Sequence, residues 1–139
     1  MSFGEALAPF LGRVVLAWYF LSEAYARALD WNATVSLLEI KNVPAAPVLH
    51  FVTLAVMVLG SISLFLGFRT RLGALVLFAF TQVANALMND YWTLNDAIAR
   101  QEAYDLFARN LAIAGGLLVL MGLGPGRFAL DNTRLGGGK

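Results

Sequence analysis

Residues 48–67 read VLHFVTLAVMVLGSISLFLG and contain no charged side chain. A run of about 20 mostly apolar residues is long enough to cross the hydrocarbon core of a bilayer as one helix. Backbone polar groups inside lipid must be hydrogen-bonded within the protein, and a helix does this within its own segment. This stretch therefore predicts a membrane-spanning helix.

Three further apolar stretches lie around this one, at about residues 7–29, 72–87 and 107–124. The connection at residues 68–71 is only four residues long, and short connections join antiparallel neighbouring helices. The sequence thus predicts an all-α membrane protein, with residues 1–139 forming one domain. Its architecture is expected to be a four-helix transmembrane bundle.

The longer connections of the chain are polar. Residues 30–47 end in a segment with two prolines and are expected to form a loop with one short surface helix. Residues 88–109 are charged, and the spacing of Leu94, Ile98 and Leu106 suits a short amphipathic segment in the membrane interface. A polar tail completes the chain.

Composition excludes several classes of function. Hydrophobic residues make up 59% of the chain and charged residues 14%, against about 45–50% and about 25% in soluble domains, so a soluble monomer is not expected. The net charge is +1 with no dense basic run, which argues against nucleic acid as a partner. Cysteine is absent and only one histidine is present. We therefore expect no catalytic group, metal site or covalently bound cofactor in this chain.

Charge is unevenly distributed between the two ends of the predicted bundle. The end with both termini and the short turn carries six basic and two acidic residues, and the opposite end carries four basic and seven acidic residues. Lysine and arginine gather on the cytoplasmic side of membrane proteins. Both termini are therefore expected to be cytoplasmic, with Arg13 anchoring the cytoplasmic end of the first helix.

Small residues predict where the helices meet. Inside lipid, helices associate through close backbone approach rather than by burying apolar surface from water. Ala108, Ala112 and Gly116 recur at every fourth position of the fourth span, with Gly115 beside them. This ridge is expected to be a helix-packing seam.

Charged and amide residues inside the spans are more informative, since a charge at mid-membrane costs at least about 2.5–3.5 kcal/mol. Glu23 and Arg27 are four residues apart, in the favourable order for an intrahelical pair. At about 1.5 Å of rise per residue, they lie roughly 15 and 21 Å from the cytoplasmic basic residue of their helix. Gln82 and Asn85 lie at roughly 16 and 21 Å on the third helix, counted the same way.

These matching depths predict a polar cluster in the outer half of the bundle, with His50 above it. Aromatic side chains of the first helix surround the same level, and such a mixture is typical of a small-molecule site that would suit a quinone head group. The predicted cofactor-binding residues are Glu23, Arg27, His50, Gln82 and Asn85. Two structural alternatives stand beside this: a self-neutralising Glu23–Arg27 pair that reaches the interface, and an interfacial His50.

Short motifs are distributed along nearly the whole chain. They are LGR at 11–13, FLS at 20–22, VP at 43–44, LFLGFRTRL at 64–72, FARNLA at 107–112, GGLL at 115–118 and GPGRFALD at 124–131. In this order they resemble the DoxX family of small four-helix membrane proteins. The Gly-x-x-Thr-Arg turn and the Gly-Pro-Gly-x-x-x-x-Asp segment are the most specific parts. The chain departs from the family by having Met57 where many members carry a glutamate.

The resemblance implies a bacterial or archaeal inner-membrane protein, like the small subunit of a thiosulfate:quinone oxidoreductase or a terminal quinol oxidase. The expected function is an accessory subunit that docks onto a larger redox complex and helps to bind quinone or lipid. It is not expected to be a self-sufficient enzyme, because a quinone needs an electron donor and the chain has no carrier motif. The alternatives are a purely structural or assembly subunit and a small transporter or channel.

Overall fold

Four long helices form the computed structural model, which describes residues 2–135. They are α1 (Phe3–Leu29), α3 (Ala46–Leu66), α4 (Thr70–Met88) and α5 (Ala97–Leu123). Each belongs to a segment long and apolar enough to cross a membrane. The prediction of an all-α, four-helix transmembrane bundle is confirmed. Residue 1 and the last four residues of the predicted polar tail, 136–139, lie outside the described part of the chain.

Three short elements complete the described fold: α2 (Trp31–Ile40), the single-turn helix η1 (Tyr91–Thr93) and α6 (Leu130–Leu135). Helix α2 is the predicted surface helix of the first long connection. The fourth span begins earlier than expected, because the Asp96 carboxylate accepts a hydrogen bond from the backbone of Ala99 at 2.9 Å and caps α5. The predicted amphipathic segment is therefore largely the beginning of α5, continuous with the span.

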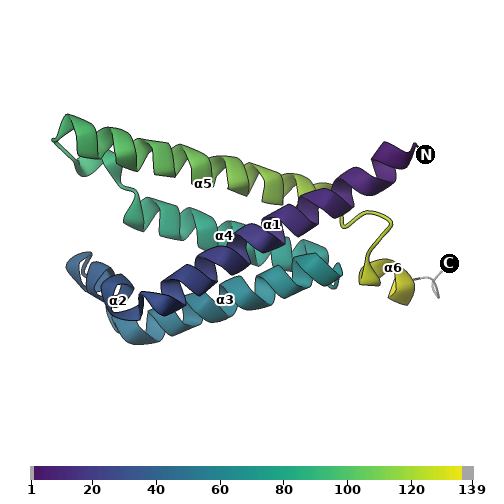
Figure 1. The fold of residues 1–139 in the computed structure, drawn as a ribbon, viewed down its shortest axis with the longest axis horizontal. Coiled ribbons are helices and arrows are strands. Elements are labelled where there is room, and N and C mark those ends of the chain that lie inside the picture. The colour runs from purple at the N-terminus through teal and green to yellow at the C-terminus, as the bar shows by residue number, and fades with distance from the viewer. Residues whose placement is uncertain (1, 136–139) are drawn as a thin grey trace.

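The helices pack in a chain of neighbours. Helix α1 lies along α3, α3 along α4, and α4 along α5, while α2 rests on α3. Figure 1 shows α1 running obliquely across the bundle and the N-terminus and α6 lying at the same end. Helix α1 makes few contacts with α5. The bundle is consequently open between α1 and α5.

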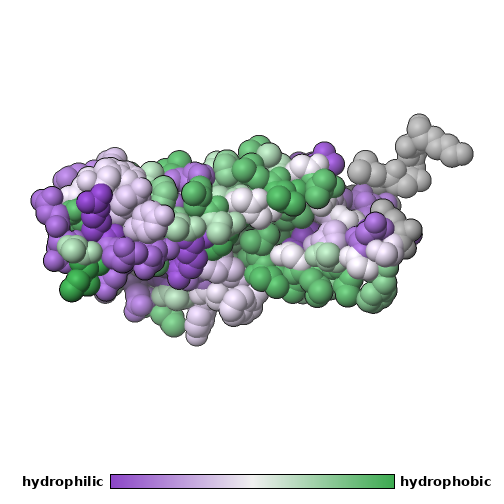
Figure 2. Space-filling model, turned by 90° about the horizontal axis from the view of Figure 1, so that it is seen from above, coloured by the Kyte–Doolittle hydropathy of each residue, from purple (hydrophilic) through white to green (hydrophobic). Residues whose placement is uncertain are grey.

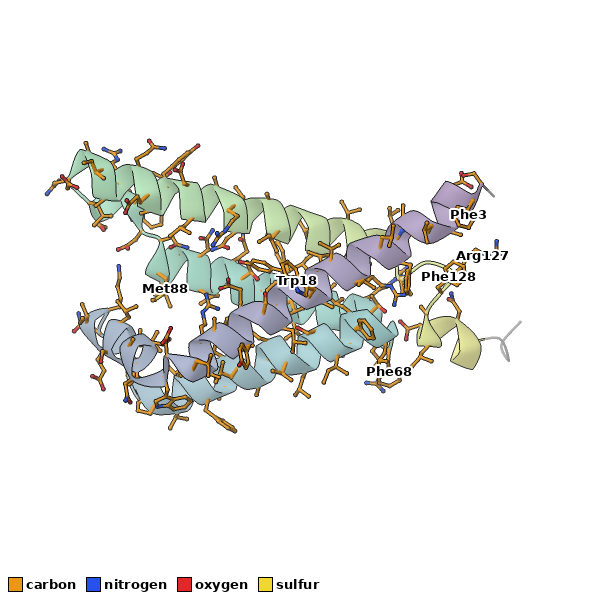
Figure 3. All side chains as sticks on the ribbon, in the orientation of Figure 1. Phe3, Trp18, Phe68, Met88, Arg127 and Phe128 are labelled. Carbon is orange, nitrogen blue, oxygen red and sulfur yellow. The ribbon has the colours of Figure 1, made fainter. Side chains whose placement is uncertain are left out.

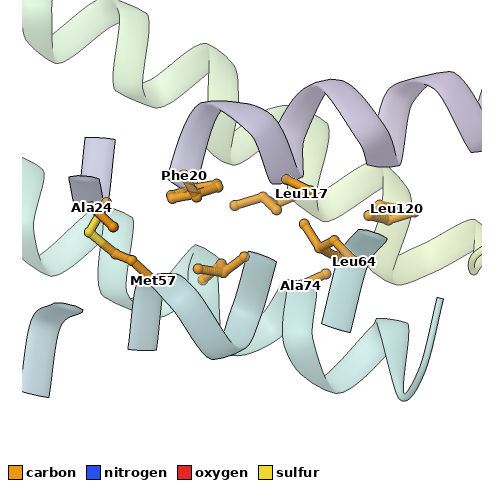
Figure 4. Close-up of a cluster of buried hydrophobic side chains, with 9 residues drawn as sticks. Phe20, Ala24, Met57, Leu64, Ala74, Leu117 and Leu120 are labelled. Carbon is orange, nitrogen blue, oxygen red and sulfur yellow. The ribbon is translucent and has the colours of Figure 1, made fainter. Parts of the chain in front are cut away.

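Apolar side chains from all four spanning helices meet in one core (Figure 4). Its buried members are Ala17, Phe20, Ala24, Met57, Leu64, Ala74, Leu77, Leu117 and Leu120. Figure 2 shows hydrophobic residues over the middle of one face and hydrophilic residues at the end opposite the termini. This banding is the pattern expected of a helical protein embedded in lipid.

Glycine allows α3 and α4 to approach closely. A Cβ atom on Gly60 would lie 2.6 Å from Cγ of Leu77, and one on Gly73 would lie 2.3 Å from Oγ of Ser63. Neither distance is compatible with a real side chain, so these two positions set the spacing of the helices. Small residues thus bring the second and third spans together at this point.

The predicted seam on the fourth span is wrong within this chain. Ala108, Ala112, Gly115 and Gly116 are all exposed. Helix α5 instead turns Ala114, Leu117 and Leu120 toward the core. The small-residue ridge therefore faces away from the packed interior.

A group of residues at the terminal end, which we call the terminal clamp, joins the C-terminal segment to the α3–α4 turn. The carboxylate of Asp131 accepts hydrogen bonds from the backbone N–H groups of Arg69 at 2.6 Å and Thr70 at 2.9 Å. The backbone N–H of Asp131 donates to the carbonyl of Gly67 at 2.9 Å. Asp131 thus caps α4, although it lies 61 residues further along the chain.

Arg13 is the fifth member of the terminal clamp. Its side chain is 1% exposed and donates to the carbonyl of Leu64 at 3.2 Å and to the carbonyl of Phe128. The prediction that Arg13 anchors the helix in the interface is therefore corrected. Its guanidinium is taken up by one backbone carbonyl at the end of α3 and one in the segment that leads to α6.

We predict that Gly67→Ala destabilises the fold. Gly67 has a φ of +68°, and a Cβ there would lie 2.1 Å from Nη1 of Arg13 and 2.5 Å from Cβ of Ala129. Backbone strain of this kind costs about 1–3 kcal/mol, and displacement of Arg13 adds to it. The measurement is thermal unfolding in detergent micelles. Gly122→Ala is the matched control, since a Cβ there meets nothing within 4 Å; equal stability of the two variants would contradict the clamp.

The clamp also predicts a pH dependence. Burial raises the pKa of the Asp131 carboxyl, but hydrogen bonds from Thr70 and Arg69 and the charge of Arg13 bring the pKa below its ordinary value of 3.8. A lowered pKa stabilises the folded state above the ordinary value, and that contribution is lost as the pH falls through the lowered pKa. The stability difference between the wild type and Asp131→Asn should therefore be full at neutral pH and shrink below about pH 4. A difference that grows on acidification would be inconsistent with this assignment.

Candidate functional site

The predicted ion pair of the first helix is present. Nη2 of Arg27 lies 3.4 Å from Oε2 of Glu23, and the side chains are 40% and 34% exposed respectively. Nη1 of Arg27 also lies 3.4 Å from Sδ of Met57 on α3. The pair therefore lies at the α1–α3 contact and is partly accessible from outside.

His50 is buried rather than interfacial. Its side chain is 0% exposed, and Nε2 lies 3.3 Å from the backbone carbonyl of Arg27. The Trp31 ring of α2 packs edge-on against the imidazole, with the centroids 4.5 Å apart. His50 is thus enclosed by α1, α2 and α3, and it holds the α1–α2 corner in place.

Asn85 is the centre of a separate amide network between α4 and α5. Its Nδ2 donates to the carbonyl of Phe107 at 3.1 Å, and its Oδ1 accepts from Asn89 at 2.9 Å and Asn110 at 3.3 Å. The hydroxyl of Tyr19 on α1 donates to Oδ1 of Asn110 at 3.3 Å. The sequence analysis missed Asn89 and Asn110, although amides within or beside an apolar span were a usable signal.

The five predicted site residues thus do not form one cluster: Glu23, Arg27 and His50 make one group, and Asn85 belongs to another. Among residues 2–135, no hydrogen bond or ion pair joins Glu23 or Arg27 to Asn85 or to Gln82, whose buried Oε1 has no hydrogen-bond partner. Tyr19 lies between the groups, because it interacts electrostatically with Glu23 and Arg27 and hydrogen-bonds the amide network. The prediction grouped these residues by depth along the helices, but helix rotation divides them. Quinone binding by these residues stays a prediction.

The amide network predicts that Asn85 and Gln82 contribute differently to stability. Asn85→Ala leaves three polar partners of a buried side chain without their hydrogen bonds, so we expect a loss of about 1–3 kcal/mol in unfolding free energy. Gln82→Ala removes a buried oxygen that already lacks a partner and should cost distinctly less. Thermal unfolding in micelles compares the two. A larger loss of unfolding free energy for Gln82→Ala than for Asn85→Ala would show that the Gln82 amide makes stabilising contacts beyond those described.

A cleft of about 1420 Å³ opens at the terminal end of the bundle. It is bounded by the first half of α1, the start of α4, the last turns of α5 and the segment that leads to α6. Its apolar walls include Val15, Leu16, Val119, Leu120 and Leu123. The cleft follows from the fold, since α1 crosses toward α3 and leaves α5 largely uncovered.

Two glycines keep the cleft wide. Gly12 lines it from α1 and Gly116 lines it from α5. A Cβ atom on Gly12 would meet no atom within 4 Å, and one on Gly116 would only reach Leu16 at 3.9 Å. Gly116, predicted as part of a packing seam, is therefore a wall of the cleft.

Arginines form the polar rim of the cleft. Arg69, Arg71 and Arg127 line it, together with the carboxylates of Glu5 and Asp131. Figure 3 shows Arg127 beside Phe128 near the N-terminal turns of α1. In the sequence these basic residues were used only to predict which side of the membrane the termini face. Nothing local in the sequence indicates that they border an apolar cleft.

Comparison with known proteins assigns the family. The model of the SURF4 family matches residues 10–135. The chain belongs to the SURF4 family. This match, together with the four spans, identifies it as an integral, multi-pass membrane protein. No solved structure matches it significantly.

Three relatives of this SURF4 family chain illustrate its range. It is 35% identical over 71 residues to a Surfeit locus protein 4 homologue of Drosophila melanogaster, covering 50% of this chain and 26% of that protein. It is 30% identical over 124 residues to the Schizosaccharomyces pombe homologue, covering 88% and 36%. It is 28% identical over 123 residues to the inner membrane protein YphA of Escherichia coli, covering 87% and 86%. The match thus spans about a third or less of the Surfeit locus homologues.

The DoxX prediction is wrong, because the SURF4 family model matches nearly the whole chain and its named relatives are Surfeit locus proteins. The two motifs considered most specific contain Gly67, Arg69, Thr70 and Asp131, all members of the terminal clamp. These residues take part in closing the bundle, and none of them has a redox-active group. The respiratory role came from that resemblance, and neither the SURF4 relatives nor the cleft supports it.

Proposed function

We propose that this protein binds a membrane amphiphile in the cleft at the terminal end of the bundle. The observation that carries the proposal is the continuity of an apolar wall, made by α1 and α5, with an arginine rim. A lipid matches this arrangement, because its hydrocarbon chain suits the apolar wall and its polar head group suits the arginine rim. The apolar part would lie between Leu16 and Leu120, and the polar part at the rim.

The size of the cleft supports a ligand larger than an isolated ring. Its volume of about 1420 Å³ exceeds the roughly 300–1,000 Å³ of ordinary small-molecule pockets. The cleft is also open to the side between two membrane-spanning helices, which gives an acyl chain direct entry from the bilayer. Each methylene group transferred from water contributes about 0.8 kcal/mol, but a ligand already in lipid gains little from burial. Selectivity must therefore come from shape and from the head group.

Binding is favoured over catalysis by the state of the polar groups. Of the two carboxylates that line the cleft, Glu5 accepts a hydrogen bond from the backbone of Ser2 at 2.8 Å, and Asp131 is held in the terminal clamp. Both carboxylates are therefore held by backbone donors of the fold. Arginine remains protonated in proteins, so the rim supplies charge and hydrogen-bond donors without proton transfer.

The expected orientation puts the cleft on the cytoplasmic side, because the basic excess lies at the terminal end. We propose the inner or plasma membrane as its location, which agrees with the name of the Escherichia coli relative that the chain covers for 86% of its length. A reporter that works only in the cytoplasm should be active when it is fused to either terminus. A reporter that works only on the other side of the membrane should be inactive at both positions.

A structural or assembly role is the second candidate. One observation favours it: Ala108 and Ala112 form an exposed small-residue surface on α5, and such surfaces allow another membrane helix to approach closely. A larger membrane protein complex is the partner this role requires. It is compatible with lipid binding, since the cleft lies further along the same helix.

Blocking the cleft tests the proposed function. Gly116→Leu puts a side chain into the cleft, where its Cβ would reach only Leu16 at 3.9 Å. Gly115→Leu adds the same side chain to the neighbouring position, where a Cβ meets nothing within 4 Å and which does not line the cleft. We expect several-fold less labelling of Gly116→Leu by a phospholipid with a photoreactive acyl chain, in purified protein in nanodiscs. Gly115→Leu should label like the wild type. Equal labelling of all three proteins would exclude the cleft as the binding site.

A further inference from the structure

We infer that the cleft selects anionic phospholipids over zwitterionic ones through Arg71 and Arg127. This inference rests on the proposed function and adds the class of head group. The argument depends on which charges at the terminal end already have partners and which do not.

Most of the charges that line the cleft are occupied. Arg13 donates to two backbone carbonyls and lies near Asp131, whose carboxylate caps α4. Glu5 closes the capping box of α1 with Ser2. Arg69 lies over the ring of Phe68, with its Cζ 5.9 Å from the centroid.

Arg71 and Arg127 are different. Both side chains are exposed and line the cleft, and within the described part of the chain neither guanidinium has a hydrogen bond or an ion pair. Each therefore offers all of its donors to a ligand. A guanidinium presents these donors in a planar fork that matches the oxygens of a phosphate.

The backbone places both of these arginines near the end of α5, where they line the same cleft. Arg71 lies in the first turn of α4 and reaches over the end of α5, where its Nη2 would be 3.3 Å from a Cβ on Gly124. Arg127 follows the end of α5 after Gly126, which has a φ of +80° and packs so closely on Pro9 that a Cβ would lie 2.7 Å from Cβ of Pro9. The turn that carries Arg127 is thus fixed against α1.

The unbalanced charge determines the preferred head group. A phosphate with a neutral alcohol, as in phosphatidylglycerol, brings one net negative charge between two unpaired cations. Phosphatidylcholine brings the same phosphate with a quaternary ammonium, which is repelled by the second arginine. Anionic lipids are also enriched in the cytoplasmic leaflet, the side on which the positive-inside rule puts this rim.

The apolar walls argue for a lipid rather than a soluble phosphate as the source of this chemistry. Leu123 on α5 and Leu11 and Val15 on α1 line the same cleft as the arginines and are themselves exposed. A soluble phosphate compound would leave these walls uncovered. A phospholipid covers them with its acyl chains while its phosphate reaches the rim.

The test compares two photoreactive phospholipids with identical acyl chains, one phosphatidylglycerol and one phosphatidylcholine. The full chain is reconstituted in phosphatidylcholine nanodiscs. We expect the wild type to be labelled several-fold more by the glycerol lipid. The double variant Arg71→Gln/Arg127→Gln should lose this preference while its labelling by the choline lipid stays unchanged. Arg100→Gln, an exposed arginine of α5 outside this cleft, is the matched control and should keep the preference.

The outcomes distinguish a failure of lipid binding in the cleft from a failure of head-group selection. If Gly116→Leu lowers labelling by both lipids but the wild type prefers neither, the proposed function stands and the head-group inference fails. If Gly116→Leu changes nothing, both fail. A preference that survives the double variant, with its unfolding temperature unchanged, overturns the role of these arginines. Complete competition by excess glycerol phosphate would assign the rim to a soluble phosphate and would also overturn the lipid inference.

Discussion

A buried guanidinium at the terminal end is the constraint on which the rest of the structure depends. Burying a charge is costly unless it is paired and hydrogen-bonded. Arg13 meets this requirement through the carbonyls of Leu64 and Phe128 and through nearby Asp131. Arg13 belongs to α1, and its partners belong to the end of α3 and the C-terminal segment, so three parts of the chain must come together before the charge is accommodated. The terminal clamp therefore closes the bundle at a single point.

The clamp also determines which helices touch. Because Arg13 binds the last turn of α3, α1 is drawn onto α3, where Phe20 and Ala24 meet Met57 in the core. Helix α5 is held mainly by α4 and contacts α1 little. The space between α1 and α5 stays open where Gly12 and Gly116 present no side chain. The cleft is thus a consequence of the same contacts that fold the protein.

The four spans could be predicted because hydropathy is a property of consecutive residues. The start of α5 could not, since a polar sequence continues the same helix beyond the membrane once Asp96 caps it. The candidate residues were grouped by their depth along the helices, but rotation about the helix axis decides which of them meet. It turned Asn85 toward Asn110 and His50 toward Trp31. The cleft was missed altogether, because its rim and walls come from segments far apart in the sequence.

The motifs that suggested a redox family are instructive for a physical reason. A glycine at positive φ and an aspartate that caps a distant helix are required by this closure of the bundle, whatever the protein binds. Their presence therefore says little about function. The closure nevertheless has an electrostatic result. Asp131 caps α4 and Glu5 caps α1, and within the described residues neither carboxylate forms an ion pair with Arg71 or Arg127. Arg71 and Arg127 are left cationic beside an apolar cleft, and folding itself thereby creates the charge that an anionic ligand can satisfy.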